Sequence, residues 1–359
     1  MLIGAYRDNE VNSSHPLMRK LDAIRKAGAP VMEIVLAPLG RNDPAQLIND
    51  ALRCEPERAM ALAELIHEKT EGNPFFAIQF LTSLVEEGLL AFAHDQGRWS
   101  WDLDRIRAKG FTDNVVDLMV GKLNRLPVET QKALQLLACM GNGAGFDLLE
   151  MVSEHSNEEM HRALWEALRA GLILRTEQSY AFLHDRVQEA AYLLIPKSAR
   201  AETHLRIGNL LVARILPEKR EEAVFEIVNQ LNRGSDLITS VEERKRLAAL
   251  NLMAGKRARS STAYASALSY LGAARALLTD QSWDEDYELI FTVECDSAEC
   301  EFLTAEMALA ENRLQMLAQC ARGAHDIAIV TCLRIALYTA LGFTDRTVEV
   351  GSSSYEGLE

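Results

Sequence analysis

The sequence lacks the features of several large classes of protein. No apolar run approaches the roughly 18 residues that a membrane-spanning helix needs, and the N-terminal run, residues 2–6, is too short for a secretory signal. Basic residues are also few. The 38 lysines and arginines face 52 aspartates and glutamates, a net charge of −14, which opposes binding to nucleic acid or anionic membranes. We therefore expect a cytoplasmic protein with no membrane span, for which nucleic acid is not the expected partner.

Cysteine is present, but in no pattern that indicates a disulfide framework or a metal site. The six cysteines are scattered, none is part of a CxxC pair, and Cys295 and Cys300 are five residues apart. No histidine lies near enough along the chain to complete an obvious metal site with them. We expect free, mostly buried thiols in a reducing cytosol, and no metal.

The sequence also has no phosphate-binding loop of the form GxxxxGK[ST]. In that loop the glycines let the backbone approach the phosphates, the lysine binds the β- and γ-phosphates, and the hydroxyl binds Mg²⁺. The nearest glycine cluster, residues 141–145, has no lysine and follows a predicted helix, so we expect a plain loop there. The apolar run ending in two acids that would hold Mg²⁺ is missing as well. We therefore expect no catalytic residue and no bound cofactor in this chain.

A chain of 359 residues is too long for one hydrophobic core, so two or three domains are expected. Near the N-terminus, the pattern predicts an amphipathic helix at residues 15–26 and a strand at residues 31–36, an apolar run between prolines. Asp43 and Pro44 form a start signal for a helix that continues to Leu52.

The segment Lys69-Thr-Glu-Gly-Asn-Pro-Phe-Phe76 separates two helical patterns, residues 59–67 and 75–88. Gly72 suits the left-handed conformation that ends a helix, and Pro74 suits the first turn of the next because it needs no amide partner. Alone, the segment predicts a helix–helix corner. A β-hairpin is predicted after it, at residues 91–102.

Residues 113–197 have the pattern of a winged helix, with successive helices and a final short hairpin. One helix has a capping-box start at Ser156. If the domain bound DNA, its recognition helix would be residues 157–170. That segment carries Arg162 and Arg169 but also three glutamates, so we expect it to meet phosphates poorly and to serve an intramolecular role.

The chain beyond residue 198 is predicted to be entirely helical. Helical runs of roughly 12–18 residues recur up to residue 343, which predicts paired antiparallel helices in a tetratricopeptide-like α-solenoid. Such a solenoid offers a surface for protein partners. The tail, residues 344–359, loses this periodicity and is predicted to be a frayed end.

Two further residues are candidate phosphate contacts. Arg7 follows the first apolar run and could reach a γ-phosphate; the alternative is a surface arginine paired with a neighbouring carboxylate. His184 stands beside Asp185 and could act as a general base. However, no nucleophile is placed near it, and the alternative is that Asp185 caps a packed helix.

Several segments together resemble the STAND branch of the AAA+ ATPases, in the form joined to kinase modules in large bacterial signalling proteins. The resemblance runs from Met1 to about Val350 and corresponds to the part of those proteins that follows the nucleotide-binding core. The segments are Gly4-Ala-Tyr-Arg-Asp-Asn-Glu10, Lys69–Phe76, Phe182-Leu-His-Asp-Arg-Val-Gln-Glu-Ala-Ala-Tyr192, Phe225-Glu-Ile-Val-Asn-Gln-Leu-Asn232 and Leu250-Asn-Leu-Met-Ala-Gly255.

The resemblance implies roles for four residues. Gly72 and Pro74 would lie against the adenine of a nucleotide, Arg7 would be the sensor arginine, and His184 would lie near the β-phosphate. ATP or ADP with Mg²⁺ would be the cofactor of the intact family protein. Because the family's catalytic parts are missing, the chain looks like a truncated gene product, a mispredicted start or one piece of a split protein.

The expected fold is mainly α. It comprises a remnant of the nucleotide-binding domain (1–58), a helical lid (59–112), a winged helix (113–197), an α-solenoid (198–343) and a frayed tail (344–359). The expected function is the non-catalytic regulatory and scaffold portion of a STAND-type ATPase in bacterial signal transduction. One alternative is that the chain completes an ATP-binding protein kinase or histidine kinase, whose catalytic domains and separate ATPase core lie outside it. Another is a winged-helix DNA-binding regulator.

Overall fold

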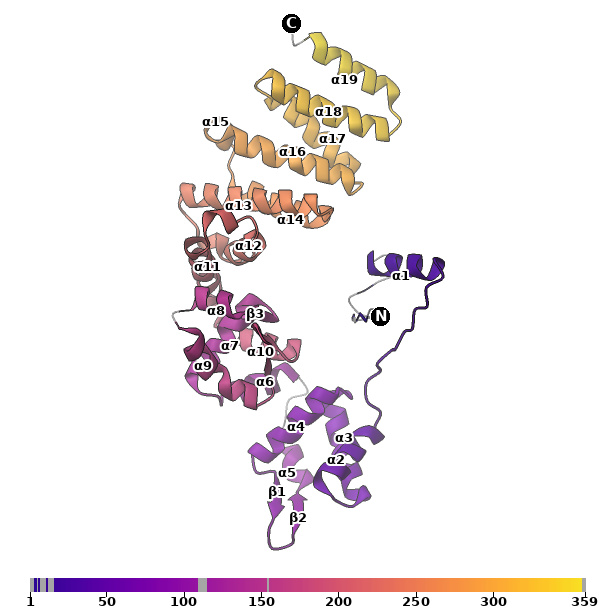
Figure 1. Cartoon of the computed structure of the whole chain (residues 1–359), viewed down its shortest axis with the longest axis vertical. Helices are drawn as coiled ribbons and strands as arrows, with labels where there is room; N and C mark the ends of the chain where they lie inside the picture. Colours follow the sequence, from indigo (N-terminus) through magenta and orange to yellow (C-terminus); the bar gives the residue numbers. More distant parts are fainter. Residues whose placement is uncertain are drawn as a thin grey trace. The chain divides into compact units, whose positions relative to one another are not determined.

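The computed structural model describes residues 3–4, 6, 11, 16–108, 115–153 and 155–356. Two compact units divide the chain, Met1–Val115 and Val116–Glu359 (Figure 1). The described residues are mainly helical, as predicted, and their few strands are short.

The first unit contains helices and one hairpin. Its core is formed where α2 packs on α3 and α3 on α4, and Ile48, Leu62 and Phe80 are buried there. The predicted hairpin is confirmed, with Phe92 opposite Trp99 in an antiparallel pair. The elements are α1 Pro16–Lys26, α2 Asn42–Leu52, α3 Pro56–Thr70, α4 Pro74–Glu86, β1 Leu90–Ala93, β2 Arg98–Trp101 and α5 Leu103–Ala108.

The strand predicted at residues 31–36 was wrong. This segment has no regular secondary structure, and the side chains of Met32, Ile34, Val35 and Leu36 are 76–90% exposed. A strand needs a hydrogen-bonded neighbour. Within the described residues no strand pairs with this segment, so its apolar side chains remain open to solvent.

The second unit begins with helices around a small sheet. Strands β3, β5 and β4 form an antiparallel sheet in that order. The capping box predicted at Ser156 is confirmed at the start of α9. The prediction of a plain loop at residues 141–145 was wrong in part, because Gly143–Gly145 form β3. A strand of this length is too short to show the alternation of apolar and polar residues by which strands are predicted. The elements are α6 Val115–Leu123, α7 Val128–Met140, β3 Gly143–Gly145, α8 Phe146–Val152, α9 Asn157–Arg169, β4 Ile173–Arg175, β5 Ser179–Phe182 and α10 Asp185–Leu193.

One hydrophobic core joins this part to the helices that follow. Cys139 of α7 and Val152 of α8 lie in the same cluster as Ile207, Val228 and Leu250. These three residues belong to the next helices, α11 (Lys197–Arg214), α12 (Val224–Leu231) and α13 (Val241–Ser260). Packing therefore continues across residue 197, and the sheet-containing part and the first solenoid helices share a core.

The remaining helices follow one another in a stack (Figure 1). Neighbours α13 and α14, α14 and α16, α16 and α17, α17 and α18, and α18 and α19 are in contact. This arrangement agrees with the predicted helical repeat. The elements are α11 Lys197–Arg214, η1 Pro217–Lys219, α12 Val224–Leu231, η2 Asn232–Leu237, α13 Val241–Ser260, α14 Tyr264–Leu277, α15 Ser282–Glu285, α16 Tyr287–Leu303, α17 Met307–Cys320, α18 Ala324–Ala340 and α19 Thr344–Glu356.

The frayed tail predicted for residues 344–359 was wrong where the structure describes it. Residues Thr344–Glu356 form α19, which packs on α18. Val350 is buried in one cluster with Leu337 and Tyr338. Helix stability in proteins comes mostly from tertiary packing, so one well-placed apolar contact can outweigh a weak sequence pattern.

Candidate functional site

The corner between α3 and α4 has the conformation that its sequence predicts. Glu71 and Gly72 both adopt left-handed backbone angles, with φ of 50° and 76°. The Glu71 N–H donates to the carbonyl of His67 at 2.9 Å, and the Asn73 N–H donates to that of Thr70 at 2.9 Å. These bonds satisfy carbonyls at the end of α3 and turn the chain into α4.

Gly72 is held against a second segment of the chain. Its carbonyl oxygen accepts a 2.8 Å hydrogen bond from the N–H of Leu39. A β-carbon at Gly72 would lie 2.4 Å from the carbonyl oxygen of Leu39. The position therefore accepts only glycine, and the loop before α2 is fixed to the corner.

Pro74 begins α4 and is exposed, whereas Gly72 is buried. The Asn73 side chain caps this helix by accepting from the N–H of Phe76 at 3.2 Å. The Asn73 cap and the hydrogen bond between Leu39 and Gly72 fix the backbone just before Pro74. The Pro74 ring is therefore an exposed apolar surface whose position is fixed by its backbone. A flat apolar group of a ligand could pack on it without reorganisation.

His67 is part of this corner, although the sequence reasoning did not single it out. A β-carbon at Gly72 would lie 3.2 Å from its Cε1 atom, and its Nδ1 atom is buried without a hydrogen-bond partner. Leu39 was missed as well. No local pattern marks either residue, because their roles depend on the contact between the corner and the loop before α2.

A hollow near the corner is too small to enclose a nucleotide. Its volume is about 180 Å³, and Leu65, Lys69 and Phe80 are among its lining residues. Pockets for small molecules usually measure about 300–1,000 Å³. The corner therefore offers a contact surface and not an enclosed site.

His184 lies in the second unit and has a structural role. Its Nδ1 atom accepts from the N–H of Arg186 at 3.1 Å, so His184 caps α10. The alternative that Asp185 caps this helix was wrong: Asp185 is its first residue. Arg7, the fourth candidate, lies outside the described residues.

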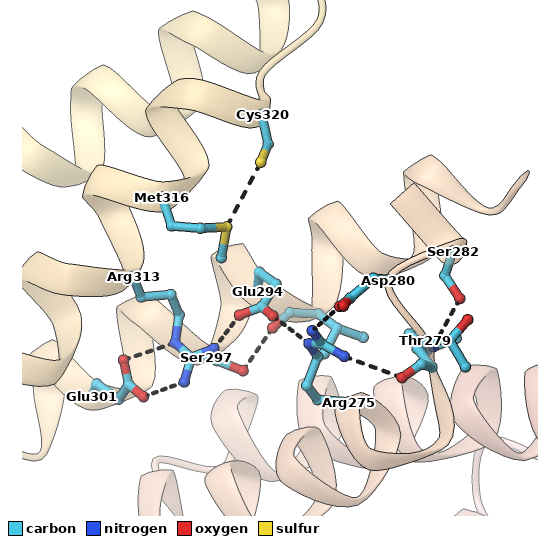
Figure 2. Close-up of polar contacts among 12 residues, drawn as sticks. Arg275, Thr279, Asp280, Ser282, Glu294, Ser297, Glu301, Arg313, Met316 and Cys320 are labelled. Atoms are coloured by element: carbon cyan, nitrogen blue, oxygen red, sulfur yellow. Dashed lines mark hydrogen bonds and ion pairs between the residues drawn. The ribbon is translucent and has the colours of Figure 1, made fainter. Parts of the chain in front are cut away.

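Buried ion pairs link three helices of the stack. Glu294 of α16 is almost fully buried, with a side chain 3% exposed, and Figure 2 shows it between Arg275 of α14 and Arg313 of α17. Arg275 donates to it at 2.7 Å. Arg313 contacts it too and also binds both carboxylate oxygens of Glu301, at 2.7 and 2.9 Å. Because separating these helices would leave the buried carboxylate of Glu294 uncompensated, the pairs favour the way in which α14, α16 and α17 meet.

The three buried cysteines have the character of unreactive thiols. All six cysteines are free; Cys332 is exposed, and Cys139, Cys295 and Cys300 are buried. Burial raises the pKa of Cys139 and Cys300 to about 11 and that of Cys295 to about 12. These three thiols stay protonated at neutral pH and are poor nucleophiles.

The described residues include neither a candidate metal site nor a helix that could span a membrane. Within them, no group of three or more histidine, cysteine, aspartate or glutamate side chains could hold a metal ion. In the same part of the chain, no helix is both long and apolar enough to cross a membrane.

Comparison with known proteins places the chain beside signalling proteins. No family model matches it. It is 29% identical over 401 residues to hybrid signal transduction histidine kinase G of Dictyostelium discoideum, covering 94% of this chain and 12% of that protein. Among solved structures, a STAND protein with a tetratricopeptide repeat sensor from Pyrococcus horikoshii matches 90% of this chain and 49% of its own, with 14% identity and a TM-score of 0.38. The chain thus spans a small part of its curated relative.

Proposed function

We propose that the chain is a non-catalytic regulatory and scaffold part of a STAND-type signalling ATPase, and that its helical stack binds protein partners. One observation carries this proposal. Almost the whole chain, 94%, aligns with a segment of a signal transduction histidine kinase, yet its sequence contains no phosphate-binding loop. Without that loop the chain lacks the usual means of holding the phosphates of ATP, so its role is to regulate and connect.

In this proposal the nucleotide site is shared with a separate ATPase core. The core holds the phosphates and Mg²⁺, and the Pro74 ring covers one face of the adenine. The exposure of Pro74 and the fixed backbone at Gly72 support this assignment. Arg7 and His184 would contact the phosphates in the same complex. Residues 1–58 then belong to the nucleotide-binding domain, and residues 59–112 act as its lid.

We further assign residues 113–197 to a winged-helix domain that acts within the protein. The order of helices followed by the β4–β5 hairpin supports this assignment. Its shared core with α11, α12 and α13 gives a path by which a partner bound to the stack could act on the domain. We place the protein in the cytoplasm, because all six cysteines are free.

The structure gives no support to DNA binding by α9. Its Arg169 pairs with Glu166 at 3.4 Å, and Glu159 lies beside the helix start as part of the capping box. These carboxylates would repel the phosphates of a duplex. Retention of the purified chain on duplex DNA at low salt, with release as salt rises, would favour the DNA-binding alternative.

ATP hydrolysis by the purified chain tests the non-catalytic role. We expect phosphate release no greater than that of a protein-free blank at saturating Mg²⁺–ATP. Release above the blank that falls on Pro74→Ala would show a complete active site in this chain and overturn the proposal.

The shared nucleotide site has its own test. The DNA next to the coding sequence should encode a GxxxxGK[ST] core, and that core should co-purify with the chain. ADP affinity of the joint complex should then fall about fivefold on Pro74→Ala, equivalent to about 1 kcal/mol of lost apolar contact. Pro56→Ala is the matched control, because Pro56 also begins an exposed helix turn in the same unit. Equal ADP affinity in the two variants would contradict the role of the corner.

A further inference from the structure

A polar pocket lies among the last three helices of the stack. Its volume is about 490 Å³, within the usual range for small-molecule sites. One face of α18 contributes Val330, Arg334 and Tyr338, which recur at helical spacing. Residues from α17 and α19, Glu311 and Arg346 among them, form the other walls.

Among the described residues, every charged side chain that lines this pocket has an ionic or hydrogen-bonded partner except Arg334. Glu311 accepts from Arg346 at 2.9 Å and from the Tyr338 hydroxyl at 3.3 Å. Glu349 also lines the pocket and has a partner of its own. Arg334 is half-buried, and its Nε atom is buried without a hydrogen-bond partner. Its guanidinium carbon lies 5.9 Å from the centroid of the Tyr338 ring.

A half-buried guanidinium without a carboxylate partner is unfavourable, because desolvation of the charge is not repaid by an ion pair. All the acids lining this pocket are otherwise engaged. The apolar lining beside Arg334 consists of Ala318, Ala321, Ile327 and Val330. Within the described part of the chain, the pocket therefore presents a cation with no carboxylate partner next to an apolar wall.

We propose that this pocket binds a carboxylate through Arg334, with an apolar group of the ligand on the Ala318–Val330 wall. The guanidinium fork matches a carboxylate in a bidentate arrangement. A monoanion fits better than a phosphate dianion, because Glu311 and Glu349 line the same pocket. The ligand is either a free acid or the C-terminal residue of a peptide. This inference rests on the proposed partner-binding role of the stack and names the chemistry it recognises.

Titration with two carboxylates and their amides tests the proposal. The probes are hexanoate for a free acid and N-acetylleucine for a peptide C-terminus, each compared with its uncharged amide by calorimetry. We expect at least one carboxylate to bind with a Kd on the order of 1 mM or tighter, and its amide to bind about tenfold more weakly. Preference for N-acetylleucine would indicate a peptide end, and preference for hexanoate a free acid.

Variants of the chain identify the residue responsible. Arg334→Ala should weaken carboxylate binding about tenfold, and Arg334→Lys, which keeps the charge but loses the fork, should weaken it about threefold. Arg246→Ala is the control, because Arg246 is an exposed arginine on α13 and does not line the pocket. Equal binding of acid and amide, equal binding by Arg334→Ala and the parent chain, or no carboxylate binding at about 10 mM would overturn the inference. Hydrolysis and ADP binding at the corner do not depend on Arg334, so failure here is distinguishable from failure of the proposed function.

Discussion

The backbone N–H of Leu39 donates a 2.8 Å hydrogen bond to the carbonyl oxygen of Gly72. This bond fastens the loop before α2 to the corner between α3 and α4. The approach leaves no room for a side chain, because a β-carbon at Gly72 would lie 2.4 Å from the Leu39 carbonyl oxygen. Gly72 thus serves two purposes, a positive φ of 76° and a close backbone contact.

Replacing Gly72 with alanine should destabilise the first unit by roughly 2–4 kcal/mol, because the left-handed strain and the clash with Leu39 add together. Gly88→Ala is the control: Gly88 also has a positive φ, of 66°, but no atom would lie within 4 Å of its β-carbon. That change should cost about 1 kcal/mol. Urea unfolding followed by tryptophan fluorescence, to which Trp99 and Trp101 of this unit contribute, measures both. Equal losses would mean that the contact with Leu39 contributes nothing.

The local features of this corner could be predicted from the sequence, but its long-range contact could not. Helix ends and starts depend on neighbouring residues, so Gly72 and Pro74 were assigned correctly to the end of one helix and the start of the next. The contact with Leu39 depends on folding of a distant loop and has no local signal. The strand predicted at residues 31–36 was wrong because the prediction used only a local pattern. The apolar pattern indicates burial, but a strand also needs a neighbouring strand, and the local sequence does not show whether one is present.

Glu294 should be the most sensitive charged residue of the stack. Glu294→Ala removes the buried carboxylate between Arg275 and Arg313. Arg313 keeps its pair with Glu301 and Arg275 keeps its bond to the Leu278 carbonyl, so the loss should be about 2–3 kcal/mol, below the full cost of orphaning a buried charge. Glu166→Ala is the control, because Glu166 also lies within a helix but its pair with Arg169 is exposed. The control should lose less than about 1 kcal/mol. Thermal unfolding by circular dichroism compares them, and a Glu294 variant as stable as the control would refute the structural role of these ion pairs.

Gly208 permits close packing between α11 and α12. A β-carbon there would lie 2.4 Å from Cδ2 and 2.6 Å from Cγ of Leu231, a buried side chain. Alanine would gain about 1 kcal/mol of helix propensity but lose about 1–3 kcal/mol to overpacking, so Gly208→Ala should be destabilising or neutral. Gly272→Ala on α14, where the β-carbon meets open space, should instead stabilise by about 1 kcal/mol.

A double variant separates these effects at Gly208. With Leu231→Ala in the background, Gly208→Ala should no longer clash and should stabilise the chain as Gly272→Ala does. Chemical unfolding of the parent chain, the two single variants and the double variant gives the coupling between the two positions. The packing explanation fails if Gly208→Ala has the same effect with and without the Leu231 side chain.

The helices of the stack could be predicted because each has a sufficiently long apolar pattern. By contrast, the sequence could not predict that Arg334 has no carboxylate partner among the described residues. A sequence shows how many charges a helix carries, but it does not show which of them form ion pairs. The tail shows the same limit. Val350 is an apolar residue in a weakly periodic segment, and its burial in one cluster with Leu337 and Tyr338, which contributes to the packing of α19, has no local signal.

The stability of the second unit should depend on pH through His204. This histidine is 1% exposed, with Nδ1 2.7 Å from the Gln230 side-chain oxygen and Nε2 2.9 Å from the Tyr192 hydroxyl. Gln230 uses its amide nitrogen to donate to the carbonyl of Cys139 at 2.9 Å, so its oxygen accepts and Nδ1 of His204 donates. In the neutral ring, Nε2 then accepts from the Tyr192 hydroxyl. Burial lowers the pKa of His204, and the positive charge of Arg233 acts in the same direction, whereas the hydrogen bond that His204 donates to the Gln230 oxygen opposes them by favouring the charged ring.

Because the folded pKa lies below the unfolded value of about 6.5, the unfolded chain takes up the proton more readily. The stabilising effect of the neutral ring is complete above about pH 6.5 and is lost as the pH falls from there to the folded pKa, by up to about 1.4 kcal/mol per pH unit. Urea unfolding at pH 7, 6 and 5 measures this slope in the parent chain, in His204→Gln and in His94→Gln, whose histidine is exposed in the hairpin turn. The slope should become shallower in His204→Gln alone. If it is the same in all three proteins, then the buried His204 ring is not the group whose protonation unfolds this part of the chain.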